Sequence, residues 1–264
     1  MPTLLHVSDV HFGPRHLPEL AQAVGELVAR ERPDVVVVSG DLTQRAKPRQ
    51  FRAARVWIDA LASPAVYVPG NHDVPMYRFW ERLLSPFGAW RSHFDPTLVR
   101  GFRADGLAVL GVNTAFAWTT KHGRLERGEI ARLERELAAL SAGGLRVLVA
   151  HHPIADTAEL RGEPVAAGGA AALDLCRRHG VELVLSGHLH RSFWLRVART
   201  GLGEGPFVAH CGTSCSNRGR GEERGRSSLH WIEADESVIR LERRIWDPRA
   251  RDFRTEARTE LPRG

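Results

Sequence analysis

Side chains that can bind metal ions follow five short, mostly apolar runs of this 264-residue chain. The runs are 4–8, 35–38, 65–68, 145–150 and 183–185. The polar residues that come within a few positions after them are Asp9, His11, Asp41, Asn71, His151, His188 and His190. Runs of this kind are typical of strands buried on both faces, as in parallel sheets. Because ligands gather at the carboxyl ends of such strands, we expect these side chains to converge.

The chemistry of this set is that of a binuclear metal centre. Carboxylate, imidazole and amide ligands without a thiolate suit Mn²⁺, iron (Fe²⁺ or Fe³⁺) or Zn²⁺, and they argue against a structural zinc site. Seven ligands are too many for one tetrahedral ion and suit two ions that share a carboxylate. Two such ions, about 3.5–4 Å apart, lower the pKa of a shared water from about 15.7 towards 7 and hold a phosphoryl group.

Taken one at a time, these residues have ordinary structural explanations. An aspartate after a strand, such as Asp9 or Asp41, usually closes a turn or caps a helix, and Asn-His pairs favour left-handed turns. The whole set, placed strand by strand, favours a metal centre instead. The other histidines fit no such pattern and are expected at the surface or in the core: His6, His16, His93, His122, His179, His210 and His230.

Five motifs stand in a fixed order along residues 9–190: Asp-x-His, Gly-Asp, Gly-Asn-His-Asp, His-His-Pro and Gly-His-x-His. This order resembles the calcineurin-like metallophosphoesterase family. The resemblance implies an α/β fold, a four-layer αββα sandwich of two mixed β-sheets flanked by helices. It also implies that one ion is held by Asp9, His11 and His190 and the other by Asn71, His151 and His188, with Asp41 bridging both.

Three polar residues stand beside the implied ligands. In the His-His-Pro pair the family pattern favours His151, directly after the run, while His152 would support a ligand or face the substrate. His72 is not a ligand in the pattern, so it could contact a phosphoryl oxygen or protonate the leaving alkoxide, worth about 10²–10⁴-fold in rate. Asp73 is expected to accept a hydrogen bond from the other ring nitrogen of His72 and to fix its orientation. His72 and Asp73 are therefore the predicted catalytic residues.

The likeness extends to bacterial cyclic-nucleotide phosphodiesterases and to relatives that act on glycerophosphodiesters. It rests on three further segments, which are 111–114, 123–125 and 212–215. The implied substrate is a small phosphodiester such as a 3′,5′- or 2′,3′-cyclic nucleotide. The alternatives are a glycerophosphodiesterase, a nuclease, which the arginines of 218–226 would suit, and a nucleotide-lipid pyrophosphatase, for which the aromatic stretch 77–94 could supply an apolar groove.

Charge and cysteine usage add weaker constraints. The net charge of +6 comes mostly from arginine and would attract phosphate-bearing substrates or bind nucleic acid loosely, but a GC-rich genome explains it equally well. Three cysteines without a CxxC pair suit a reducing compartment. The sequence shows neither a signal peptide nor an apolar run near 18 residues, so we expect a cytoplasmic protein without a membrane span. The oligomeric state is open, a homodimer being one option.

The elements that must position the ligands alternate between strand and helix over the first two thirds of the chain. Apolar periodicity predicts helices at 17–30, 48–61, 126–140 and 169–178. Further strands are expected at 107–112, 192–198, 206–210, 227–233 and 237–243. The aromatic residues 75–95 form either a substrate-facing cap or packing over the sheet edge. We predict one metallophosphoesterase domain over 1–246, followed by a surface segment, 247–264, that lacks apolar periodicity.

Overall fold

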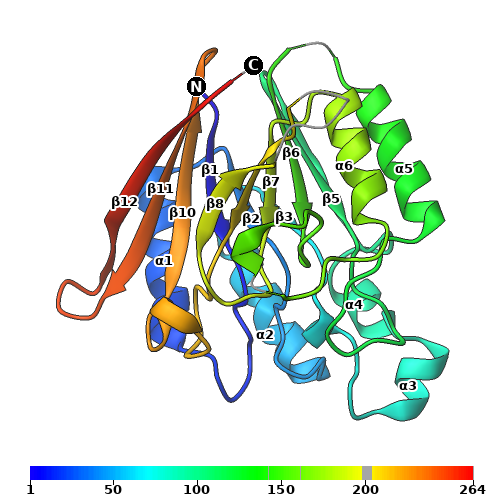
Figure 1. Ribbon diagram of the computed structural model, residues 1–264. Helices are drawn as coiled ribbons and strands as arrows, with labels where there is room; N and C mark the ends of the chain where they lie inside the picture. Colours follow the sequence, from blue (N-terminus) through cyan, green and yellow to red (C-terminus); the bar gives the residue numbers. More distant parts are fainter. Residues whose placement is uncertain (142, 161, 198–203, 264) are drawn as a thin grey trace.

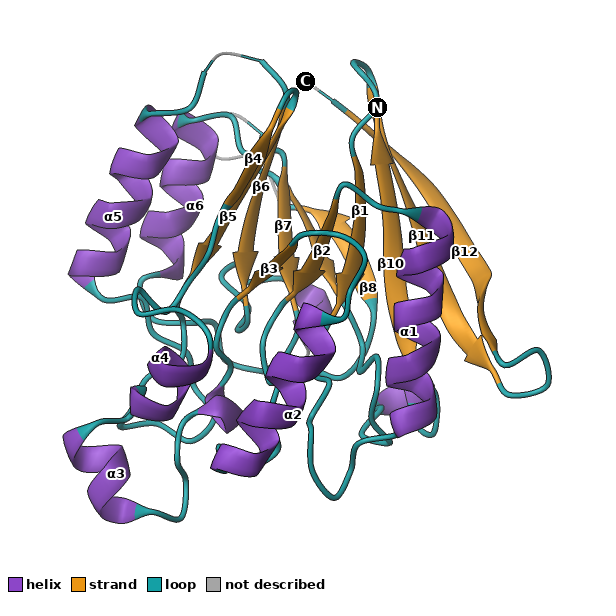
Figure 2. Ribbon diagram, turned by 180° about the vertical axis from the view of Figure 1, so that it is seen from behind, coloured by secondary structure: helices purple, strands orange, loops and turns teal. Residues whose placement is uncertain are grey.

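Two six-stranded sheets face each other in the computed structural model, which describes residues 1–264 apart from 142, 161, 198–203 and 264. Helices cover the outer face of each sheet (Figures 1 and 2), so the layers run helix, sheet, sheet, helix. This is the four-layer sandwich that the resemblance implied, and the predicted fold class is confirmed.

The bounds of the elements follow the sheet order. The first sheet runs β12 (Asp252–Pro262), β11 (Val238–Asp247), β10 (Ser228–Ala234), β1 (Thr3–Val7), β2 (Val35–Val38) and β3 (Ala65–Tyr67). The second runs β4 (Phe102–Ala104), β5 (Leu107–Val112), β6 (Leu145–Ala150), β7 (Leu183–Ser186), β9 (Phe207–His210) and β8 (Phe193–Arg196). The helices are α1 (Pro18–Glu31), α2 (Pro48–Asp59), α3 (Phe79–Leu84), α4 (Gly88–His93), α5 (Arg127–Ala138) and α6 (Gly169–Arg178).

Strand β2 shows why apolar runs become central strands here. It pairs in parallel with β1 and β3, and all four of its valines are completely buried. Val36 and Val38 join the core beneath α1 and α2, whereas Val35 and Val37 join the core between the two sheets. Burying each such side chain contributes about 1.5–3 kcal/mol to stability. A third core packs the second sheet against α5 and α6.

The parallel strands of both sheets finish at one end of the molecule (Figure 2). These strands are β1, β2 and β3 in the first sheet and β5, β6, β7 and β9 in the second. Helices α3 and α4 lie at this same end, and the amino terminus lies at the other (Figure 1). The loops that follow the strands are therefore gathered where the sequence predicts the metal centre.

The carboxyl-terminal segment 247–264 corrects one expectation. Residues 252–262 form β12, which pairs with β11 in antiparallel register from Val238↔Pro262 to Asp247↔Asp252. The segment therefore belongs to the first sheet and does not trail from it. An edge strand needs few apolar residues, and here only Phe253 and Leu261 are buried, so its hydrophobic pattern was too weak to predict it. The last residue of the predicted strand 192–198 lies outside the described residues.

The aromatic stretch 75–95 divides between the two predicted roles. Trp90 on α4 is completely buried and packs against Phe94 and Phe51. On and before α3, by contrast, Tyr77 and Trp80 are 74% and 70% exposed.

In the described part of the chain, no helix is both long enough and apolar enough to cross a membrane.

Candidate metal centre

All seven predicted ligands lie at the carboxyl ends of parallel strands from both sheets. Asp9 and His11 follow β1, Asp41 follows β2, Asn71 follows β3, His151 follows β6, and His188 and His190 follow β7. They form two adjacent groups of buried side chains. The predicted convergence is therefore what the structure shows, while the roles of the residues as ligands remain a prediction.

The first group surrounds the Asp9 carboxylate. Its Oδ1 atom lies 3.0 Å from His190 Nε2 and 3.4 Å from His11 Nε2, and the two imidazole nitrogens are 3.2 Å apart. Asp41 Oδ2 lies 3.8 Å from His11 Nε2. One potential ligand atom from each of these four residues lies within 4.8 Å of the others.

The second group surrounds the Asn71 side-chain oxygen. Asn71 Oδ1 lies 3.2 Å from His151 Nε2 and 3.1 Å from His188 Nδ1. The other carboxylate oxygen of Asp41, Oδ1, lies 3.4 Å from His151 Nε2. The two oxygens of Asp41 therefore face the two groups, as expected of a shared ligand.

These separations fit divalent cations. Metal–ligand bonds of about 2.0–2.2 Å place neighbouring ligand atoms of a tetrahedral or octahedral ion about 2.8–3.6 Å apart. The closest contacts of each group fall at 3.0–3.4 Å. Asp9 Oδ1 is buried and accepts no hydrogen bond from any described residue. Gathering acceptor atoms away from water is unfavourable unless a cation joins them.

The backbone turns that present the ligands are unusual. Five of the seven predicted ligands have positive φ, from 51° to 69°: Asp9, His11, Asp41, His188 and His190. Residues other than glycine enter this region at a cost of order 1–3 kcal/mol each, and such conformations cluster at functional sites. The sharp turns let short loops direct their side chains at a common point.

Glycines in the motifs leave room for the ligands. A Cβ atom at Gly70 would overlap the carboxylate of Asp41, and a Cβ atom at Gly187 would overlap the hydroxyl of Ser8 and approach Asp9. Any larger residue at these two positions would therefore displace a predicted ligand. This gives a steric reason for the glycine in Gly-Asn-His-Asp and in Gly-His-x-His.

Backbone carbonyls orient two of the histidines. His151 Nδ1 donates to the Ser39 carbonyl at 2.7 Å, and His190 Nδ1 donates to the Arg218 carbonyl at 2.9 Å. In the neutral form of each ring, these bonds leave Nε2 as the atom that faces a cation, and a cation bound there would take the place of a second proton. Burial lowers the pKa of His151, but the Asp41 carboxylate outweighs it and raises that pKa to about 9. Asp41 itself stays ionised, so the site carries the negative charge that a cation needs.

His152 lies beside the second group and makes different contacts. Its Nδ1 atom is 2.8 Å from the Thr114 hydroxyl, and its ring centroid is 4.5 Å from that of His188. Its Nε2 atom is buried without a hydrogen-bond partner among the described residues. It is His151, however, whose ring approaches both Asn71 and Asp41, which supports the predicted choice between the two.

The predicted hydrogen bond between His72 and Asp73 is wrong. His72 Nδ1 donates instead to the Gln44 carbonyl at 2.8 Å, and the His72 main-chain N–H donates to Asp41 Oδ1 at 2.8 Å. The His72 ring lies edge-on to His11, with centroids 5.0 Å apart. Its place beside the metal centre thus agrees with the prediction, but Gln44 orients it. A main-chain carbonyl has no signature in a sequence, so this partner could not be found there.

Asp73 holds two loops together. Its carboxylate accepts main-chain N–H groups from Leu42 at 3.1 Å, Thr43 at 2.7 Å and Gly70 at 3.0 Å. Burial and the nearby Asp41 carboxylate raise the pKa of Asp73 to about 7, while the N–H groups oppose that rise. The residue therefore fixes the loop after β2 against the loop after β3, and these two loops carry Asp41 and Asn71.

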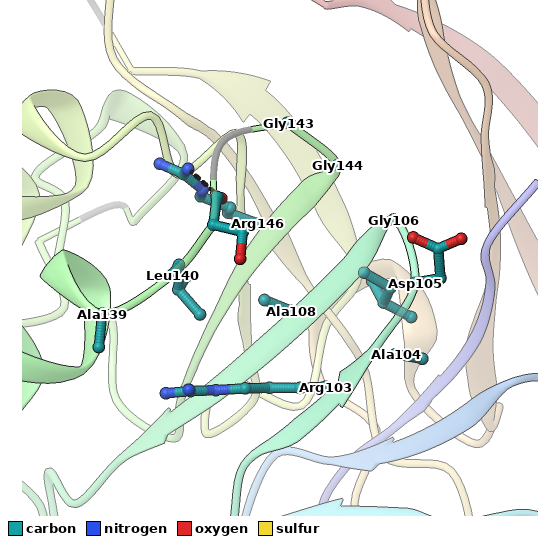
Figure 3. Close-up of a pocket in the computed structure, with 12 residues that line it drawn as sticks. Arg103, Ala104, Asp105, Gly106, Ala108, Ala139, Leu140, Gly143, Gly144 and Arg146 are labelled. Atoms are coloured by element: carbon teal, nitrogen blue, oxygen red, sulfur yellow. Dashed lines mark hydrogen bonds between the residues drawn. The ribbon is translucent and has the colours of Figure 1, made fainter.

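Hollows at the two ends of the molecule differ in what lines them. A hollow of 390 Å³ lies at the amino ends of β5 and β6, where Figure 3 shows Arg103 extending across it, far from the predicted ligands. Next to the centre lie a hollow of 380 Å³ that includes Gln44 and Arg218, and one of 100 Å³ that includes His72 and Tyr77. A substrate held at the centre would extend into one or both of these two neighbouring hollows.

Comparison with known proteins identifies the family. The family model described as calcineurin-like phosphoesterase matches residues 2–192. The chain belongs to this family. The match covers every predicted ligand, and it confirms the family that the motif order indicated.

Individual relatives agree with this assignment. The chain is 30% identical over 178 residues to a probable cyclic nucleotide phosphodiesterase of Synechococcus sp., covering 67% of this chain and 65% of that protein. It is 30% identical over 245 residues to a cAMP/cGMP dual specificity phosphodiesterase of Mycobacterium tuberculosis, covering 84% and 72%. Purple acid phosphatase of yellow lupin superposes with a TM-score of 0.74 at 15% identity, over 99% of this chain and 53% of that one, a likeness of fold alone.

Proposed function

We propose that this protein is a phosphodiesterase that uses two divalent cations to hydrolyse small phosphodiesters such as 3′,5′- or 2′,3′-cyclic nucleotides. The observation that carries the proposal is the Asp41 carboxylate, whose two oxygens face two groups of potential ligand atoms. The two relatives named as cyclic nucleotide phosphodiesterases support the same substrate class.

The proposed ligand sets are those implied by the motifs. One ion is held by Asp9, His11 and His190, the other by Asn71, His151 and His188, and Asp41 is shared. Oxygen and imidazole ligands without a thiolate support Mn²⁺, iron or Zn²⁺ as the bound ions. When bound, such a pair lowers the pKa of a shared water and neutralises charge on the phosphoryl group.

The protein supplies the proton for the leaving group from His72. The Gln44 carbonyl accepts a hydrogen bond from Nδ1–H, so Nε2 is the atom that donates to the leaving alkoxide. His72 also lines the hollow of 100 Å³ with Val74, Met76 and Tyr77, which gives the part of the substrate beyond the leaving oxygen an apolar surface. Asp73 acts through the loops that it joins and does not touch the reacting atoms.

A cytoplasmic location is part of the proposal. Cys176, Cys211 and Cys215 are free and completely buried. Burial raises the pKa of all three thiols, which keeps them protonated and unreactive. Unpaired cysteines of this kind suit a reducing compartment.

The decisive experiment is a substrate panel with Mn²⁺ added. It compares bis-p-nitrophenyl phosphate, p-nitrophenyl phosphate, both classes of cyclic nucleotide, glycerophosphodiesters and single-stranded DNA. We expect turnover of small diesters to exceed that of the monoester. Monoester turnover above diester turnover would overturn the proposal, and faster cleavage of DNA than of any small diester would favour the nuclease alternative.

A further inference from the structure

Three arginines line the hollow of 380 Å³ beside the metal centre. They are Arg15 from the loop after β1, Arg45 from the loop before α2, and Arg218 from the loop after β9. The hollow and the centre share a wall: the Gln44 carbonyl binds His72 and the Arg218 carbonyl binds His190, and both residues also line the hollow. A molecule held at the centre would therefore extend into the hollow.

No carboxylate of a described residue contacts the guanidinium groups of these three arginines. None of their guanidinium groups makes an ion pair or a hydrogen bond with a described residue, and that of Arg45 lies 5.6 Å from the Tyr77 ring centroid. Arginines elsewhere are engaged; Arg132, for example, pairs with Glu129 and Glu136. The carboxylates of Asp41 and Asp9 attract Arg218 without contacting it, but no carboxylate lines the hollow itself. Like charges that converge repel one another, so an anion bound in the hollow would offset the repulsion among the three arginines.

The metal centre does not use this charge either. The scissile phosphodiester carries one negative charge, and the proposed cation pair neutralises it. A cyclic nucleotide bound there would leave the three guanidinium groups facing solvent. Guanidinium groups bind phosphate through paired hydrogen bonds, which makes a second phosphate the anion that best fits them.

We propose that the preferred substrate carries a second phosphate group in addition to the scissile diester, and that this phosphate binds between Arg15, Arg45 and Arg218. The inference rests on the proposed function, because it takes the metal centre as the place of the scissile group. Arg45 lines both hollows beside the centre, so one substrate can place its second phosphate in the larger hollow and an apolar group beside Tyr77 in the smaller.

The test measures binding and needs no hydrolysis. Titration calorimetry with Mn²⁺-loaded protein compares thymidine 3′,5′-bisphosphate with thymidine 3′- and 5′-monophosphates. We expect the bisphosphate to bind at least about tenfold more tightly than either monophosphate, since charge-assisted hydrogen bonds to phosphate are among the strong ones. In the double variant Arg15→Ala/Arg45→Ala this ratio should fall to about one.

A matched control is Arg103→Ala. Arg103 also lines a hollow and makes no ion pair with a described residue, but it lies at the opposite end of the second sheet. Its loss removes one positive charge, as each substitution of the double variant does, and should leave the ratio unchanged. A bisphosphate without advantage, or an advantage that survives the double variant, would overturn the inference.

Two further measurements distinguish this inference from nucleic-acid binding and from failure of the proposed function. If affinity keeps rising with each added phosphate of a thymidylate oligomer, the hollow belongs to a nucleic-acid track and the single-phosphate site is refuted. Turnover of bis-p-nitrophenyl phosphate is followed in parallel. Its absence, with the bisphosphate ratio intact, would refute the proposed function and leave the phosphate site standing.

Discussion

Replacing His72 with alanine tests the proposed division between ion binding and proton transfer. The structure gives His72 two separate contacts: its ring donates to the Gln44 carbonyl, and its main-chain N–H donates to Asp41 Oδ1. Alanine removes the ring and keeps the main-chain bond, so Asp41 keeps its orientation. We therefore expect His72→Ala to retain both metal ions.

The size of the effect should depend on the leaving group. A general acid is worth about 10²–10⁴-fold, which corresponds to about 2.7–5.5 kcal/mol of barrier. For a cyclic nucleotide, whose leaving group is a poor alkoxide, kcat should fall by that factor. For bis-p-nitrophenyl phosphate, whose leaving group departs without a proton, kcat should fall by less than about tenfold.

Elemental analysis and steady-state kinetics on both substrates check this prediction. His179→Gln is the control, since His179 follows α6 on the far side of the second sheet. Equal losses on both substrates would refute the role of His72 as the acid. Loss of a metal ion from His72→Ala would show that a ligand had been mistaken for an acid.

Other changes test the rest of the centre. Asn71→Ala removes the oxygen between His151 and His188, so elemental analysis should find the metal content falling from about two ions per chain to about one. Asp73→Asn turns an amide donor towards main-chain N–H groups, which should cost about 1–3 kcal/mol and lower Tm by roughly 3–10 °C in a thermal scan, with metal content unchanged. Gly70→Ala places a methyl group on the Asp41 carboxylate, and both metal content and diester turnover should collapse. Removing the ions with a chelator should lower Tm, because ligand binding to the native state stabilises it, and Mn²⁺ should restore it. An unchanged Tm would contradict the proposed site.

The sequence predicted the convergence of these side chains because each predicted ligand follows a strand. A run such as Val35–Val38 can be recognised as a buried strand, and the turn after it places Asp41 at the sheet edge. The same logic applies at the ends of β1, β3, β6 and β7. Topology then brings residues that are far apart in the chain to one place, as with Asp9 and His190.

The failures have a common physical origin. The sequence suggests Asp73 as the partner of His72 because a carboxylate next to a histidine often accepts its hydrogen bond, but Asp73 accepts main-chain N–H groups instead. The partners that orient His72, His151 and His190 are carbonyl groups, which every residue has. Strand β12 was missed because an edge strand exposes most of its side chains. The charged hollow was also missed, since its three arginines meet only in the folded chain.

Each of the two ligand groups draws on both sheets. Asp9 and His11 come from the first sheet and His190 from the second, while Asn71 comes from the first and His151 and His188 from the second. The proposed cation pair would therefore link the two sheets, and any sliding of one sheet over the other would move its ligands apart. The distances between the predicted ligands then depend on how firmly the two sheets pack together. Smaller side chains in place of the valines between the sheets would let the sheets move and would weaken metal binding.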